Sequence, residues 1–102
     1  MGKRSKKYKE DYLYKRLQNS KEAAAYLNEC LKDEDPAVFL IALRDVIKAN
    51  GGMSKLAEEI DRNRESLYRS FSINGNPGIN TLVDTLDLYG LEINVKPMKL
   101  HA

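Results

Sequence analysis

The apolar residues of this chain recur at helical spacing. Three short sequence motifs that typically begin or end helices divide them into separate segments. Asp35-Pro36 and Asn76-Pro77 each join a side chain that accepts from free helical N–H groups to a proline that suits the first helical turn. Asn50-Gly51-Gly52 supplies residues that tolerate a positive φ and so end a helix. The sequence therefore predicts an all-α fold of short helices.

Five or six helices are expected from this pattern. The first is a short amphipathic segment, Tyr8 to Leu17, whose apolar side suits docking on a partner surface. The second is capped by Ser20 or by Asn19. The expected helices cover residues 8–17, 20–31, 36–49, 54–60, 64–71 and 77–89. The last is expected to bury Ile79, Leu82, Val83, Leu86 and Tyr89.

Residues 91–96, Leu-Glu-Ile-Asn-Val-Lys, alternate between apolar and polar with a period of two, and Pro97 follows them. This pattern predicts one short C-terminal β-strand. A single strand leaves its backbone N–H and C=O groups without a ladder to join. Its expected partner therefore lies outside the chain, either as the same strand of a second copy or as the sheet edge of another protein.

The 102 residues suffice for one small globular domain. The composition, 42% apolar and 31% charged, is typical of a soluble protein. No apolar run approaches the roughly 20 residues of a membrane span, and the basic N-terminus lacks the apolar region of a secretory signal. The single cysteine, Cys30, cannot form an internal disulfide and is interpreted as a small core residue rather than a reactive thiol. We therefore expect a cytoplasmic protein that does not bind a membrane.

Catalytic and metal sites are not expected. The one histidine, His101, and the one cysteine do not complete a zinc site. No Ser/His/Asp set, carboxylate pair or glycine-rich phosphate loop is recognisable. The sequence thus predicts neither an enzyme nor a cofactor.

Charge is unevenly distributed along the chain, although the net charge is only +2. Residues 1–16 hold seven basic and two acidic residues, a net +5, whereas residues 17–35 hold two basic and five acidic residues, a net −3. Residues 62–69 hold three arginines and one glutamate, a net +2. A basic arm and a second basic cluster are typical of a protein that meets a polyanion. For the first seven residues the alternative is a solvated tail.

Residues 53–71, MSKLAEEIDRNRESLYRSF, have the construction of a helix-turn-helix, with two short helices that cross at a large angle. Ala57 is small enough for such a crossing, and Asp61 is expected in the left-handed turn, where glycine is more usual. The alternative is an ordinary helical hairpin. The apolar contacts between the two helices are expected from Leu56, Ile60, Leu67 and Phe71.

The polar side of the second helix carries groups suited to reading a DNA groove, because arginine bonds a guanine edge, asparagine an adenine, and glutamate accepts from cytosine. Asn63 has the alternative role of a helix N-cap, and Glu65 that of an i+4 partner of Arg69. Ser54 and Lys55 suit a phosphate at the start of the first helix. The predicted DNA-contacting residues are Ser54, Lys55, Asn63, Arg64, Glu65, Tyr68, Arg69 and Asn74.

Short motifs between about Tyr8 and Pro97 carry a family resemblance. They are Asp11-Tyr12-Leu13, Ala24-Ala25-Tyr26-Leu27, Asp35-Pro36-Ala37, Gly52-Met53-Ser54, Arg64-Glu65-Ser66-Leu67-Tyr68-Arg69, Asn74-Gly75-Asn76-Pro77 and Leu88-Tyr89-Gly90-Leu91. Together they resemble the HigA-type addiction-module antidote proteins, which have a lambda-repressor-like (Xre) helix-turn-helix. Asp61, Arg62 and Asn63 depart from that family, which has a glycine, an apolar residue and a serine or threonine there.

The resemblance implies a lambda-repressor-like bundle that acts as an antitoxin and neutralises a RelE/HigB-type messenger-RNA endonuclease. It also implies a homodimer that represses its own operon by binding double-stranded operator DNA. The rival interpretations are a repressor without a toxin partner and a protein-interaction module that has lost DNA binding. The departures at Asp61 and Arg62 support the second rival.

The expected organisation is a basic arm with a short amphipathic segment (1–19), a DNA-binding domain (20–97) and a C-terminal tail (98–102). Because toxins that cleave messenger RNA are basic where they meet RNA, an acidic surface and the amphipathic segment are predicted to hold the toxin. The alternative is that these acidic residues only offset helix dipoles and keep the surface soluble. The predicted toxin-binding residues are Tyr12, Leu13, Glu29, Asp33 and Glu34.

Overall fold

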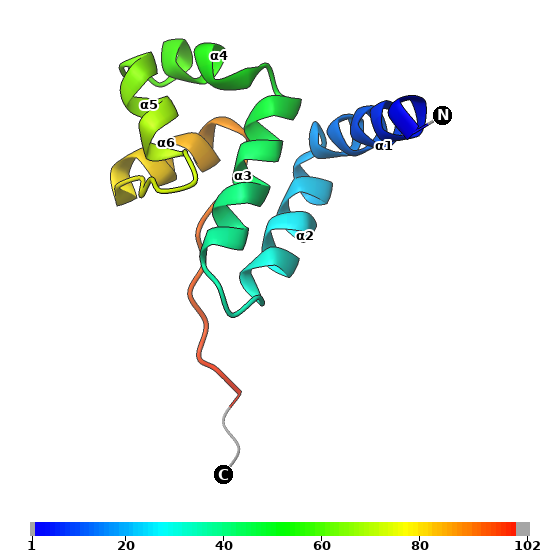
Figure 1. Cartoon of the computed structure of the whole chain (residues 1–102). Helices are drawn as coiled ribbons and strands as arrows, with labels where there is room; N and C mark the ends of the chain where they lie inside the picture. Colours follow the sequence, from blue (N-terminus) through cyan, green and yellow to red (C-terminus); the bar gives the residue numbers. More distant parts are fainter. Residues whose placement is uncertain (1, 100–102) are drawn as a thin grey trace.

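Six α-helices make up the part of the chain described by the computed structural model, namely the backbone of residues 2–99 and the side chains of residues 10–99 (Figure 1). The helices are α1 (Gly2–Leu17), α2 (Ser20–Leu31), α3 (Ala37–Ala49), α4 (Gly52–Glu59), α5 (Arg64–Ser70) and α6 (Ile79–Leu88). The predicted all-α class is confirmed. The basic side chains before Glu10, the last three residues of the predicted tail and His101 lie outside the described residues. Within the described residues, no helix is long and apolar enough to cross a membrane.

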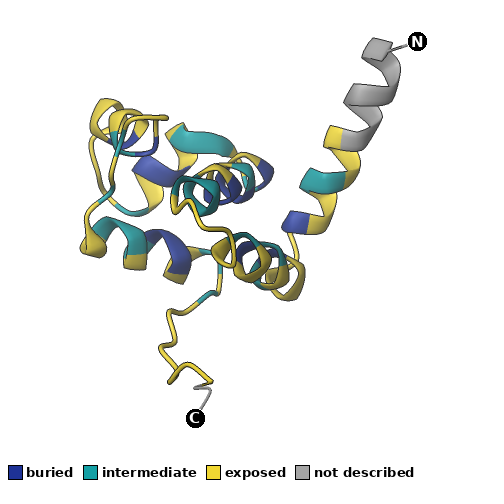
Figure 2. Ribbon diagram, turned by 60° about the horizontal axis from the view of Figure 1, so that its bottom comes forward, coloured by how far each residue is buried: buried dark blue, intermediate teal, exposed yellow. Residues whose placement is uncertain are grey.

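Helix α3 lies at the centre of the bundle and packs against α1, α2 and α4. Its inner side is a stripe at helical spacing, made of Ala42, Leu43, Val46 and Ile47, all of them fully buried. Figure 2 shows the buried residues on the inner sides of the helices and the exposed residues on their outer sides. One hydrophobic core therefore holds the helix pair α4–α5 against α3.

Helix α1 packs most of its apolar side on its own chain, whereas the sequence pattern suggested that the apolar side of residues 8–17 docks on a partner surface. Leu17 is buried in the core, and Leu13 and Tyr14 pack partly buried against it. The ammonium group of Lys48 on α3 lies 5.7 Å from the centre of the Tyr14 ring, a cation–π arrangement. The helix also begins before Tyr8, at Gly2. Of the apolar residues predicted to meet a partner, Tyr12 stays exposed.

Helix α2 is held at its start and along its length by polar contacts. Asn19 is its N-cap, the second of the two predicted caps, and its side-chain oxygen accepts from the backbone N–H of Glu22 at 3.1 Å. The Tyr26 hydroxyl donates to Asp45 of α3 at 2.8 Å. Burial and this hydrogen bond raise the pKa of Tyr26 well above its usual range, so the tyrosine stays neutral and keeps donating.

Cys30 packs half-buried against the core, as predicted from its place in the apolar stripe. Burial raises the pKa of its thiol, which lowers the fraction of reactive thiolate at neutral pH.

Helix α6 begins two residues after the predicted proline device and turns a different stripe inward. Gly78 is its N-cap, and no side chain caps it. Ile79 is 65% exposed and Val83 is also exposed, so the prediction that both are buried is wrong. Ile79 is the first residue of the helix, and Val83 lies beside the inward stripe rather than on it.

The inward stripe of α6 includes a polar residue that the apolar pattern missed. Thr85 is fully buried, and its hydroxyl donates to the carbonyl of Thr81 at 2.7 Å. This local bond satisfies the hydroxyl, so its burial leaves no donor without a partner. Leu86 is buried next to it, and burial raises the pKa of Tyr89, one turn further on, to about 12.

The predicted C-terminal strand is not present within the described chain. The N–H of Leu91 donates to the carbonyl of Leu86 at 2.8 Å and anchors the end of α6. Residues 91–99 then run as an extended segment that passes the lower ends of α2 and α3 and leaves the bundle (Figure 1). The physical reason is that the other described residues are helices and loops, which offer no strand for pairing.

Candidate functional site

Helices α4 and α5 form a pair joined by a short turn. Leu56 and Ala57 of α4 are buried, as is Leu67 of α5, and Phe71, at the C-terminal end of α5, is 1% exposed. Ile60, in the turn, packs partly buried against the same core. The apolar contacts predicted for this pair are confirmed. They fix the inner side of α5, so its remaining side chains face outward.

Asp61 occupies the sharpest point of the turn. Its φ of 55° is the only positive φ of a non-glycine residue within the described residues. The following N–H, of Arg62, donates to the carbonyl of Ala57 at 2.9 Å and closes the end of α4. The predicted left-handed conformation of Asp61 is therefore confirmed. Aspartate, like asparagine, tolerates this conformation better than most residues with side chains, although less well than glycine.

Asp61→Gly should raise the free energy of unfolding by about 0.5–1 kcal/mol, because glycine adopts this φ without the steric cost of a side chain. Asp61→Val should lower it by about 1–2 kcal/mol, since a β-branched residue fits the left-handed region poorly. Urea unfolding followed by circular dichroism measures both changes. Glu58→Gly, inside α4, is the matched control and should destabilise by about 1 kcal/mol. A loss of stability in Asp61→Gly as large as that in the control would contradict the strained turn.

Arg62 pairs with a carboxylate of α6 and so links the turn to that helix. Its charge is therefore not free to add to the basic cluster predicted for residues 62–69. Its guanidinium lies 2.7 Å from the carboxylate of Asp84 and also donates to the carbonyl of Ile60 at 3.1 Å. The predicted net charge of residues 62–69 is thus partly offset by a residue 22 positions away. Because Asp84 has no sequence relation to the turn, the linear charge count could not include it.

Asn63 serves as the N-cap of α5. Its side-chain oxygen accepts from the N–H of Ser66 at 2.9 Å, which is the capping role named as an alternative to base reading. Glu65 and Arg69 are both exposed and form no ion pair with each other in the described part of the chain. Both side chains therefore remain available on the outer side of α5.

The outer side of α5 brings several predicted residues together. Arg64, Glu65 and Arg69 are exposed, and Tyr68 is 53% exposed. The guanidinium of Arg64 donates to the hydroxyl of Ser54, in the first turn of α4, at 3.3 Å. The exposed Lys55 follows Ser54 directly. We call the set Ser54, Lys55, Arg64, Glu65, Tyr68 and Arg69 the α5 face.

Asn74 lies exposed in the loop after α5, and its neighbour Gly75 holds that loop against the helix. A side chain at Gly75 would collide with the backbone of Arg69 and Ser70, the last residues of α5. The N–H of Gly75 also donates to the carbonyl of Ser72 at 2.9 Å. The close approach explains the glycine in the Asn74-Gly75-Asn76-Pro77 motif, which the sequence pattern alone did not explain.

Two basic residues of α3 extend the candidate surface and were not predicted. Arg44 and Lys48 are exposed and line a hollow of about 630 Å³, whose walls include Tyr14 of α1 and Tyr68 of the α5 face. Their spacing of four residues on the outer side of α3 was the available signal. Asp45 also borders the hollow but accepts from Tyr26.

The predicted toxin-binding residues fall into two separate groups. Tyr12 and Leu13 lie on α1, before the start of α2. Glu29 lies in the last turn of α2, and Asp33 and Glu34 follow that helix. A helix of 12 residues is about 18 Å long, so α2 separates the two groups. The three acidic residues are all exposed.

Comparison with known proteins adds an independent observation. Residues 7–97 match the model of a family described as "Probable addiction module antidote protein". A protein of Haemophilus influenzae, itself described only as uncharacterized, is 32% identical over 80 residues, which cover 78% of this chain and 81% of the relative. No solved structure matches the chain. The matched residues include all of α2 to α6 and the whole α5 face.

Proposed function

Because this chain belongs to the family of probable addiction module antidote proteins, we propose that it is an antitoxin that represses its own operon by binding operator DNA through the α5 face. The family implies a toxin partner. We propose further that this toxin is a RelE/HigB-type messenger-RNA endonuclease. In the same proposal, α4 and α5 act as a lambda-repressor-like helix-turn-helix of the HigA type, and the repressor is a homodimer.

The observation that carries DNA binding is the outward polar side of α5, backed by the buried Leu67 and Phe71. A helix whose inner side is held in the core can place its outer side in a major groove while the rest of the domain stays folded. Arg64 and Arg69 provide planar groups for guanine edges. Lys55, at the start of α4, and Arg44 and Lys48, on α3, provide positive charge for phosphates on either side.

A two-fold dimer suits a palindromic operator. One α5 helix of each copy would then lie in successive major grooves, about 34 Å apart. Asn63 is excluded from this base-reading set in the proposal, because its side chain is engaged as the N-cap of α5. The residues proposed to contact base edges are Arg64, Glu65, Tyr68 and Arg69. Those proposed to contact the sugar-phosphate backbone of the DNA are Ser54, Lys55 and Asn74.

Operator binding is tested by fluorescence anisotropy with a duplex from the region upstream of the gene, against a shuffled duplex of equal length. We expect the upstream duplex to bind at least about a thousandfold more tightly, which is the usual margin of specific recognition. The dissociation constant should also rise steeply with salt, as phosphate contacts require. Equal affinity for the two duplexes would refute the repressor part of the proposal and favour a pure protein-interaction module.

The toxin part is tested separately by expressing the chain together with the product of the adjacent open reading frame. One of the two proteins carries an affinity tag. The proposal expects co-purification and rescue of growth from the toxin's endonuclease activity. If the adjacent reading frame yields no toxic product and no complex, a repressor without a toxin partner explains the chain better.

A further inference from the structure

The chain runs on after α6 as an extended segment, residues 91–99. Leu91 is half-buried and bonded to Leu86, but residues 92–99 make no backbone hydrogen bond to the rest of the described chain. Ile93 is exposed, and Val95 is 88% exposed. Alternating apolar side chains beside unpaired N–H and C=O groups are the features of an edge strand that lacks its neighbour.

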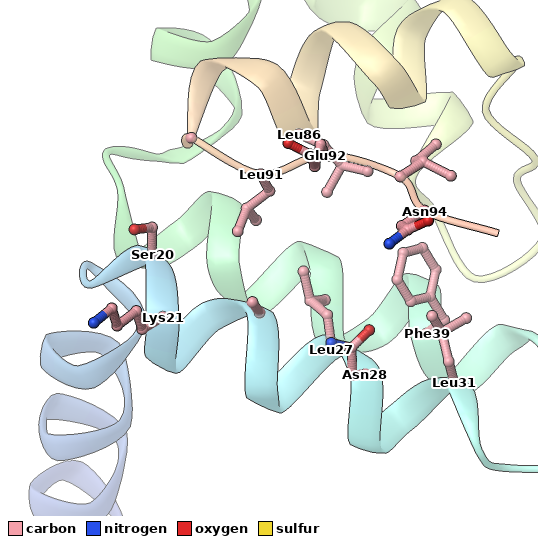
Figure 3. Close-up of a pocket in the computed structure, with 13 residues that line it drawn as sticks. Ser20, Lys21, Leu27, Asn28, Leu31, Phe39, Leu86, Leu91, Glu92 and Asn94 are labelled. Atoms are coloured by element: carbon pink, nitrogen blue, oxygen red, sulfur yellow. The ribbon is translucent and has the colours of Figure 1, made fainter. Parts of the chain in front are cut away.

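A groove lies between this segment and the helices beside it (Figure 3). The groove has a volume of about 360 Å³ and separates residues 90–94 from α2. Leu27, Leu31 and Phe39 are among the apolar side chains that line it, together with Leu91 and Ile93. Leu31 is itself exposed. Two strands alone are marginally stable in water, but two strands packed on a helix are not limited in this way.

The sequence of the segment is complementary to itself in one antiparallel register. If Asn94 of one copy lies opposite Asn94 of the other, Glu92 faces Lys96 of the second copy, and this pair occurs twice because of the two-fold axis. Ile93 faces Val95 in the same register, also twice. Opposite residues alternate between hydrogen-bonded and non-hydrogen-bonded pairs along an antiparallel ladder. When the Asn94 pair is hydrogen-bonded, Pro97 lies opposite Leu91 in a non-hydrogen-bonded pair, where the N–H that proline lacks is not needed.

From the unpaired backbone, the groove and this complementarity, we infer that residues 91–97 pair with the same residues of a second copy as an antiparallel ribbon centred on Asn94. The inference deepens the proposed function, since it rests on the homodimer proposed there and specifies its interface. The ribbon places Val95 of each copy beside Ile93 of the other and covers the apolar mouth of both grooves. Charge complementarity favours a second copy over a foreign sheet edge, because both partners of each ion pair come from this chain.

A charge exchange tests the register without DNA or toxin. We expect Glu92→Lys and Lys96→Glu each to raise the dimer dissociation constant by about tenfold or more, because each creates two like-charge pairs. The variant with both changes restores the opposite charges and should return to within about threefold of the wild type. Sedimentation equilibrium of the full chain at several concentrations measures all four proteins. Glu59→Lys, on α4, is the control for a charge reversal elsewhere.

Disulfide trapping provides a second readout. In a Cys30→Ser background, Asn94→Cys should form a disulfide-linked dimer on oxidation, because the paired Cα atoms would lie about 5.5 Å apart. Glu92→Cys should not link to itself, since residue 92 pairs with residue 96 in this register.

The inference would be overturned if neither single charge reversal raised the dimer dissociation constant. It would also be overturned if the dissociation constant of the double variant stayed as high as those of the single variants. It would also be overturned if these variants stayed dimeric but lost the co-purified toxin, a result that assigns the strand to the toxin's sheet. A monomeric wild type without DNA would overturn it as well. Loss of operator affinity in proteins that keep their dimers would instead count against the α5 face.

Discussion

Replacing Arg64 and Arg69 together by alanine should weaken binding to operator DNA by about a hundredfold or more and leave the fold intact. Each arginine that bonds a guanine edge through two N–H groups contributes about 1–3 kcal/mol of discrimination. Both side chains are exposed, and neither forms an ion pair within the described residues, so their loss should hardly change the free energy of unfolding. Fluorescence anisotropy measures the affinity, and circular dichroism confirms the helix content.

The matched control for this variant removes the same charge from another surface. Lys21→Ala with Lys32→Ala, both exposed on or beside α2, should change operator affinity by less than about threefold at physiological salt, where distant charges are screened. The arginine variant should also still co-purify with the toxin, since the predicted toxin residues lie on other elements. Equal operator affinity in the arginine variant and the wild type would remove the α5 face from the DNA-binding proposal.

Phe71→Ala should lower the free energy of unfolding by about 3–5 kcal/mol, the range measured when a buried phenylalanine is cut back to alanine. Phe71 is 1% exposed and ends α5 against the core that α3 supplies. Because a domain of this size is stable by about 5–15 kcal/mol in total, this loss should remove a large part of its stability and lower the urea midpoint of unfolding. Urea unfolding at 25 °C measures the change.

Ile73→Ala is the matched control for this prediction. It removes a large apolar side chain two residues away, but Ile73 is 82% exposed, so stability should change by no more than about 0.5 kcal/mol. If the two variants lost equal stability, or if Phe71→Ala lost less than about 1 kcal/mol, Phe71 would not be the anchor of α5.

The helices of this fold and their order follow from local rules, which explains why they could be predicted. Apolar residues at helical spacing select the inner sides of α2 to α5, and Asn19, Gly51 and Asn63 act within a few residues of themselves. The left-handed turn at Asp61 is of the same local kind. Much of the α5 face was therefore predictable as well, because once Leu67 and Phe71 are buried, the outward positions are determined.

The features that could not be predicted join residues far apart in the sequence. Arg62 meets Asp84, and Tyr26 meets Asp45, only because the packed helices bring them together. The same packing turns Thr85 inward and leaves Ile79 exposed, although the apolar pattern predicts that Ile79 is buried. The C-terminal segment differs in kind, because its pattern indicates a strand while the chain by itself offers nothing for that strand to pair with.

The tie between Arg62 and Asp84 has a consequence for the operator itself. It fastens the turn before α5 to α6, and α6 continues through Leu91 into the segment proposed to join two copies, with no linker between them. Two copies joined in this way would hold their α5 helices at a constant separation and rotation. An operator lengthened by a few base pairs between its half-sites would move one site round the double helix, and only one copy could then reach its bases.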